Sequence, residues 1–155
     1  MLEIRRVLMA TDFSPCASKA LELACEMAAR FSADLHLLHV QKDSLPYHGY
    51  EFEYPAEIQQ QLDQLPAACW CDRLRVTRSI RVGPPALEIV TDATERGSDL
   101  IVMGTHGHGP IKHLILGSVA ERVVRSAPCP VLTVRDPATL TSPGSDDHPQ
   151  TATGG

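Results

Sequence analysis

Strand-like segments alternate with helical patterns along most of the chain, and this alternation limits the folds that the chain can adopt. The segments read RRVLMA (5–10), LHLLHV (35–40), RLRVTRSIRV (73–82), DLIVMG (99–104) and PVLTVR (130–135). Strands that are apolar on both faces, such as LIVM, are typical of parallel sheets covered by helices on both sides. The alternation and a length that suits one domain predict a single doubly wound α/β domain with a five-stranded parallel sheet.

Residues that favour helix boundaries lie between these segments. Ser14 followed by Pro15 predicts a helix start, because Ser caps free amides and Pro fits the first helical position. Gly97 predicts a helix end. Ser118 and Glu121 have the spacing of a capping box, in which both side chains cap one helix start. We expect helices near 15–31, 57–65, 85–96 and 118–127.

The composition excludes several classes of protein. The chain has 155 residues, no run of about 18 apolar residues, and an N-terminal apolar stretch too short for a signal peptide. We therefore expect a cytoplasmic protein without membrane insertion. Its cysteines are odd in number and lack the spacing of a disulfide framework, which indicates a reducing compartment; they are Cys16, Cys25, Cys69, Cys71 and Cys129. A single residue separates Cys69 from Cys71, whereas a thioredoxin-like site needs two, so we expect part-buried packing there.

The charge is unevenly distributed along the chain. The net charge is −5, but residues 1–135 hold 16 acids against 14 bases, so this part is nearly neutral. It lacks the clustered basic residues that nucleic acid binding requires. The remaining segment, 136–155, is rich in Pro, Ser, Thr and Gly and has no Lys or Arg. We therefore predict a folded domain over 1–135 and a disordered tail over 136–155.

A glycine-rich stretch, GTHGHGPIKHLILGS (104–118), follows the fourth strand. Glycine lets backbone amides approach an anion closely, and the helix expected after it adds free amides and a partial positive charge. In sheets of this kind, ligands bind at the carboxyl ends of the strands where the strand order reverses. The stretch therefore predicts a phosphate site, to which the Ser118 hydroxyl and the Lys112 charge would add. The alternative is that these glycines serve only the turn, since neither a Walker motif nor a first-turn GxGxxG is present.

Asp12 follows the first strand, at the same edge of the predicted sheet. Its carboxylate can accept a hydrogen bond from a ribose hydroxyl or hold a metal ion on a phosphate. The alternative role is to cap the helix that follows, together with Ser14.

The histidines do not favour a metal site. His106, His108 and His113 have no companion Cys or acid in the loop, so we prefer a polar loop to a zinc site there. His36 and His39 lie in a strand expected to be buried, which favours hydrogen-bonded core residues over ligands.

The spacing Gly104-x2-Gly107-x9-Gly117-Ser118 resembles the signature of the ATP-binding branch of the universal stress protein family. The resemblance extends over residues 5–135 and includes ATDFS, DLIVMGTHG, GSVAERVVRSAPCPVLTV and the Gly-Pro-Pro turn. It implies a Rossmann-like sheet in the order 3-2-1-4-5 and an ATP molecule held between strands one and four. It also implies a homodimer joined through the last strand, Pro130 to Arg135, and a role as a nucleotide-binding regulator in stress responses.

The same resemblance implies a set of nucleotide-binding residues. The first strand supplies Thr11 and Asp12, and Ala10 stands where many members have proline. The adenine would lie against Val40. Met103 and Gly104 would line the adenine and the ribose. The phosphates would lie on His106, Gly107, Gly117, Ser118 and Val119. The ligand is expected to be ATP, with AMP or ADP as alternatives, accompanied by Mg²⁺ for which Asp12 is a candidate ligand.

The sequence leaves three alternative functions. We favour an ATP-binding regulatory module with at most slow hydrolysis, because the glycine-rich stretch supplies no evident base for attack on the γ-phosphate. The second is an enzyme, either a weak ATPase or a nucleotidyl transferase. The third is a nucleotide-free dimeric protein that binds another protein. The sequence identifies neither a regulatory partner nor an assembly beyond the dimer.

Overall fold

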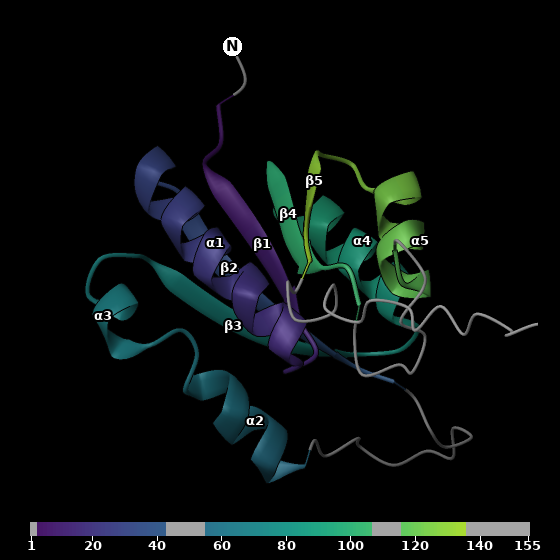
Figure 1. The fold of residues 1–155 in the computed structure, drawn as a ribbon, viewed down its shortest axis with the longest axis horizontal. Helices are drawn as coiled ribbons and strands as arrows, with labels where there is room; N and C mark the ends of the chain where they lie inside the picture. Colours follow the sequence, from purple (N-terminus) through teal and green to yellow (C-terminus); the bar gives the residue numbers. More distant parts are fainter. Residues whose placement is uncertain (1–2, 43–54, 107–115, 136–155) are drawn as a thin grey trace, which may run out of the picture.

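A central sheet organises the chain (Figure 1). The structure is a computed structural model that describes residues 3–42, 55–106 and 116–135. Within these ranges the sheet has five parallel strands in the order β3-β2-β1-β4-β5, which confirms the predicted fold. The strands are β1 (Arg6–Thr11), β2 (Asp34–Gln41), β3 (Val76–Val82), β4 (Leu100–Gly104) and β5 (Val131–Val134).

Helices cover both faces of this sheet. The described ranges contain α1 (Pro15–Phe31), α2 (Ala56–Asp63), α3 (Ala68–Cys71), α4 (Pro85–Arg96) and α5 (Ser118–Ser126). α1 packs on one face, chiefly against β1 and β4, while α4 and α5 lie together on the other face (Figure 1). The four-residue α3 was not predicted, since a helix this short shows no periodic pattern. None of the described helices is long and apolar enough to cross a membrane.

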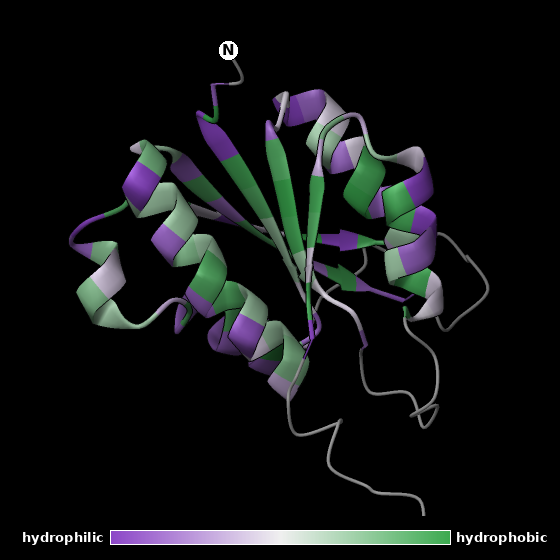
Figure 2. Cartoon of the chain, turned by 45° about the horizontal axis from the view of Figure 1, so that its top comes forward, coloured by the Kyte–Doolittle hydropathy of each residue, from purple (hydrophilic) through white to green (hydrophobic). Residues whose placement is uncertain are grey.

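Neighbouring residues of each strand point to opposite faces and build two cores. Val7, Met9 and Leu37 belong to the cluster that packs under α1, whereas Leu8 and Leu38 belong to the cluster under α4 and α5. This alternation is the pleat of a strand, and here both sides of the pleat are apolar. The central strands β1 and β4 are accordingly mostly apolar, between helices of mixed character, whereas β3 carries polar residues such as Arg78 and Arg81 (Figure 2).

The start of α1 and the end of α4 agree with the sequence. The Ser14 hydroxyl accepts from the amide of Ala17 at 3.1 Å, and Pro15 is the first residue of α1. Gly97 ends α4 with a φ of 61°, the left-handed conformation that glycine adopts without strain.

The predicted capping box at α5 is wrong. Ser118 is the first residue of α5, so the capping position falls on Gly117, which has no side chain to accept from the free amides. Glu121 instead pairs with Arg125 at 2.9 Å. The free amides in the first turn of α5 therefore donate no hydrogen bond to a side chain of the capping residue.

The cysteines are free thiols, in keeping with their lack of a disulfide-framework spacing. All five lie in the described ranges, and none forms a disulfide. Cys69 and Cys71 are exposed, so the expectation that they are part-buried is wrong: the short α3 holds both on its surface, and Trp70 between them packs against the α1 cluster.

Candidate functional site

A cavity of about 680 Å³ opens at the carboxyl ends of β1, β2 and β4. At this edge the strand order reverses between β1 and β4, because β2 and β3 lie on one side of β1 and β4 and β5 lie on the other. The volume is within the range of about 300–1,000 Å³ that small-molecule sites occupy. We call it the crevice. Its lining includes the strand ends at Ala10–Asp12, Leu38–Lys42 and Met103–His106, and the helix starts at Pro85 and Gly117–Ala120.

The start of α5 forms one wall of the crevice. The amides of Ser118, Val119 and Ala120 belong to the first turn, where no intrahelical acceptor exists. The aligned peptide dipoles give this end of the helix a partial positive charge. The glycine at the capping position supplies no side chain to accept from these amides, and the residues that carry them line the cavity, so this wall suits an anion.

Gly117 also has a role inside the chain. Its own amide donates to the carbonyl oxygen of Thr105 at 2.7 Å, so this amide is already used. A Cβ atom at Gly117 would lie 3.0 Å from that oxygen, which is tighter than ordinary contact. Gly117 is thus required for close approach between the end of β4 and the start of α5.

Gly104 allows a second close approach, between the end of β4 and the start of α1. A Cβ atom there would lie 2.9 Å from Sγ of Cys16 and 3.2 Å from its carbonyl carbon. Because the backbone of α1 cannot move aside cheaply, a side chain at Gly104 would push β4 and α1 apart at the crevice.

Asp12 is fixed at the mouth of the crevice by the turn that follows β1. Its Oδ1 accepts from the amide of Ser14 at 3.0 Å, while the Thr11 hydroxyl accepts from the amide of Phe13. Phe13 has a φ of 62°, and its ring stacks on His39 with centroids 4.7 Å apart. The capping of α1 belongs to Ser14, so Asp12 is not its cap. The turn therefore presents Asp12 to the cavity that it lines.

The two histidines of β2 are hydrogen-bonded and buried, as predicted. His39 donates through Nδ1 to the carbonyl oxygen of Thr11 at 2.9 Å, since a carbonyl only accepts. His39 also lines the crevice, whereas the sequence predicted only a hydrogen-bonded core residue. The ring nitrogens of His36 lie 2.7 Å from the Thr77 hydroxyl and 2.8 Å from the Ser79 hydroxyl.

A buried ionic cluster fastens α4 to β2 and β3. Asp92 is only 1% exposed, and its carboxylate lies 3.0 Å from Nε of Arg96 and 3.4 Å from Nη1 of Arg81. Nε2 of His36 lies 3.5 Å from the same carboxylate. Burial lowers the pKa of His36 to about 4, the charge of Arg96 lowers it too, and Asp92 acts in the opposite direction. His36 is therefore neutral at pH 7, and the cluster is structural, since none of these side chains lines the crevice.

The structure brings nearly all the predicted site residues together. Those that line the crevice are Ala10, Thr11, Asp12, Val40, Met103, Gly104, His106, Gly117, Ser118 and Val119. Gly107 lies outside the described residues, as do Lys112, His108 and His113. The described ranges hold no group of three or more side chains placed to bind a metal ion.

Several lining residues were missed by the sequence analysis. They are Ala17, Leu38, His39, Gln41, Lys42, Pro85, Ile89, Thr105 and Ala120. The carboxyl ends of β2 and β4 were expected at this edge. The positions of Gln41, Lys42 and Thr105 at these ends could therefore have predicted that they line the crevice. Ile89 had none, because its approach depends on how α4 packs.

Comparison with known proteins agrees with this architecture. The model of the universal stress protein family matches residues 3–135. The chain belongs to this family. Universal stress protein MJ0531 of Methanocaldococcus jannaschii is 32% identical over 142 residues, which cover 86% of this chain and 83% of that protein. Universal stress protein YxiE of Bacillus subtilis is 30% identical, with 84% of this chain and 98% of that protein covered.

Solved structures show the same universal stress protein fold. The hypothetical protein MJ0577 matches with a TM-score of 0.73 and 27% identity, over 86% of this chain and 97% of that one. A universal stress protein in complex with cAMP matches with a TM-score of 0.63 and 27% identity, over 85% and 97%. A universal stress protein from Archaeoglobus fulgidus in complex with dAMP matches with a TM-score of 0.64 and 25% identity, over 86% and 99%.

Proposed function

We propose that this universal stress protein binds an adenine nucleotide in the crevice and acts as a regulatory binding module. The observation that carries the proposal is the open first turn of α5, which faces the same cavity as Asp12 and Val40. One wall thus suits phosphate, another suits a ribose hydroxyl, and the strand ends contribute the apolar side chains of Leu38, Val40 and Met103. Two relatives in complex with cAMP and dAMP support the adenine nucleotide class.

Each part of the nucleotide has a matching part of the crevice. The base would lie against Val40 and Met103, whose side chains are apolar. Asp12 would accept from a ribose hydroxyl, because its carboxylate is held at the mouth of the crevice by Ser14. The phosphates would accept hydrogen bonds from the amides of Ser118, Val119 and Ala120.

We infer that ATP is the ligand and that Mg²⁺ accompanies it. Mg²⁺ retains several waters and is bound through one or two carboxylates together with substrate phosphates. Asp12 fits that requirement, since it supplies one carboxylate beside the phosphate wall. The ion would neutralise phosphate charge there, and Asp12 would orient it.

We further propose a homodimer joined through β5. This strand lies at an edge of the sheet, and its four residues are all part-exposed. An apolar edge strand has backbone groups that a second copy can pair.

The five free cysteines support a cytoplasmic location, where thiols stay reduced.

Isothermal titration of the purified protein tests the nucleotide proposal. We expect saturable binding of AMP, ADP and ATP, one per chain, and weaker binding of GTP. Ligand at 100 times its dissociation constant should stabilise the fold by about 2.7 kcal/mol. Asp12→Ala should weaken binding, whereas Asp34→Ala should not, because Asp34 begins β2 at the opposite edge of the sheet. The absence of binding and of thermal stabilisation with all four nucleotides would contradict the proposal.

A further inference from the structure

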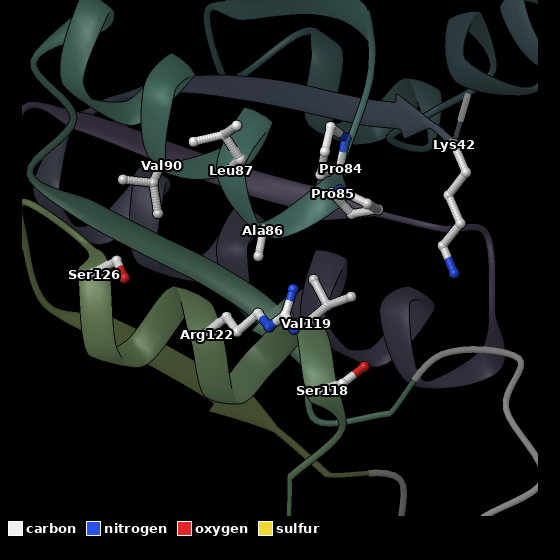
Figure 3. A pocket seen from close by; sticks show the side chains of 10 residues that line it. All are labelled: Lys42, Pro84, Pro85, Ala86, Leu87, Val90, Ser118, Val119, Arg122 and Ser126. Carbon is white, nitrogen blue, oxygen red and sulfur yellow. The ribbon is translucent and has the colours of Figure 1, made fainter. Parts of the chain in front are cut away.

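A second hollow adjoins the crevice and runs between α4 and α5, from the first turns of both helices to Val90 and to Ser126, the last residue of α5 (Figure 3). We call it the α4–α5 groove. It encloses about 400 Å³, and its lining includes Pro84, Leu87, Val90 and Arg122. Four residues line both hollows, namely Lys42, Pro85, Ser118 and Val119. A ligand held at the start of α5 can therefore extend from the crevice into the groove.

The charged residues that line the groove are both cations. Lys42 reaches it from beyond the end of β2 and Arg122 from α5, and none of the described lining residues is acidic. Figure 3 shows the amine of Lys42 and the hydroxyl of Ser118 directed to the same part of the groove, with Arg122 beside Val119. This arrangement favours an anionic ligand.

Arg122 and Arg125, the two arginines of α5, differ in their hydrogen-bond partners. Within the described ranges the guanidinium of Arg122 takes part in no hydrogen bond or ion pair. Arg125, three residues later, pairs with Glu121 at 2.9 Å and lies outside the groove lining. A guanidinium is suited to phosphate because its donors form a planar fork. None of the residues that the structure describes occupies the donors of Arg122, so they can bind a ligand in the groove.

The backbone adds to this preference for an anion. α4 begins at Pro85 with Pro84 at its capping position, and no side chain of that residue caps it. The positive ends of α4 and α5 thus face one hollow together with the two cations. Lys42, Arg122 and both helix starts act on the same volume.

We propose that the α4–α5 groove holds the distal phosphates of a nucleoside polyphosphate whose adenosine end lies in the crevice, with Arg122 and Lys42 as the residues that select for phosphate number. The inference rests on the proposed function and extends it. The phosphate next to the ribose lies at Ser118, where the two hollows meet. The added charge of ATP over AMP is held in the groove.

The test compares ATP with AMP in the unchanged protein and in three variants. Arg122→Gln should weaken ATP binding about tenfold, which is about 1.4 kcal/mol, while AMP affinity changes less than twofold. Arg122→Lys should restore part of the ATP affinity. Arg125→Gln removes the same charge from the same helix outside the groove and should change neither affinity. The selective loss should shrink between 50 and 200 mM salt, because Arg122 is exposed and its charge is screened.

The outcomes separate this inference from the proposed function. Equal losses of AMP and ATP affinity in Arg122→Gln, or no loss of either, would overturn the inference and leave adenine nucleotide binding intact. If the unchanged protein binds neither nucleotide, the proposed function fails and the inference fails with it. The melting temperature of each variant without nucleotide shows whether its fold is preserved.

Discussion

The backbone amide of Gly117 donates a 2.7 Å hydrogen bond to the carbonyl oxygen of Thr105, and this bond joins the start of α5 to the end of β4. Thr105 is itself bound to the edge of the sheet, because its amide donates to the carbonyl oxygen of Val134 at 2.8 Å. The first turn of α5 is thus positioned by the sheet. Its open amides face the crevice for that reason.

Gly117→Val should weaken nucleotide binding. The added side chain would meet the Thr105 oxygen, since even a Cβ atom would lie 3.0 Å from it. The start of α5 must then move, and we expect ATP affinity to fall at least tenfold with a loss of about 1–3 kcal/mol in stability. Titration calorimetry measures the affinity and urea unfolding the stability. Unchanged ATP affinity would refute the role of this wall.

Ser118→Ala is the matched control for the amides. It removes the hydroxyl but keeps the backbone amide, so we expect ATP affinity to fall no more than about fivefold, the value of one hydrogen bond of about 1 kcal/mol. A loss as large as that of the Gly117 variant would mean that the side chain, rather than the backbone, holds the phosphate.

Asp92→Asn should destabilise the fold without touching the crevice. The buried carboxylate accepts charge-assisted hydrogen bonds from Arg96 and Arg81, and its loss leaves both with weaker partners. We expect a cost of about 1–3 kcal/mol in the free energy of unfolding. Glu95→Gln, which removes another partner of Arg81, should cost less than about 1 kcal/mol because Glu95 is 61% exposed. Equal effects of the two changes on urea unfolding would refute the structural role of the buried carboxylate.

His36 should make the stability depend on pH in a defined window. The pKa of His36 is about 4 in the folded chain, against an ordinary value of 6.5. Between these values the unfolded chain binds a proton that the native chain does not, so stability falls as the pH falls from 6.5 toward 4. The loss should reach about 2 kcal/mol at pH 5 and at most about 3 kcal/mol.

Urea unfolding at pH 7 and pH 5 measures this loss. His36→Gln should abolish the part of the pH dependence that belongs to the imidazole. Between pH 7 and pH 5 the free energy of unfolding of this variant should fall by about 2 kcal/mol less than that of the unchanged chain. Identical slopes in the two proteins would show that another group carries the titration.

Thr133→Pro should prevent self-association and preserve the fold. The carbonyl oxygens of Pro130 and Val134 accept from Ile101 and Thr105 of the β4 segment. In the alternation of a parallel ladder, the amide of Thr133 therefore faces away from β4. Proline at that position removes an outward donor and leaves the sheet bonds in place.

Sedimentation equilibrium tests this prediction. The unchanged chain should sediment as a dimer and Thr133→Pro as a folded monomer. Leu132→Pro, whose lost amide faces β4, should instead destabilise the domain. A dimer that survives Thr133→Pro would place the contact elsewhere.

The sheet could be predicted from the sequence because its information is local and repeated. β1, β2 and β4 are apolar on both faces, and the residues between them carry clear helix signals such as Ser14 and Gly97. The strand order came from a resemblance to a family, and the position of the crevice follows from that order.

Other features depend on contacts between distant parts of the chain. Ser118 and Glu121 satisfy the capping-box spacing, but the contact of Gly117 with Thr105 places Gly117 at the cap instead. The stack of Phe13 on His39 depends on the turn after β1, and Arg122 has a signal only once α4 and α5 lie side by side. Spacing in the sequence could not reveal these contacts.

The most direct test follows the backbone amides of α5 by NMR while ATP is added to ¹⁵N-labelled protein. We expect large, saturable shifts of the amide signals of Ser118, Val119 and Ala120, with little change at Arg125 in the last turn of the same helix. Saturation of the protein with ATP while these three amide signals stay where they are would contradict the proposal that these amides bind the phosphates.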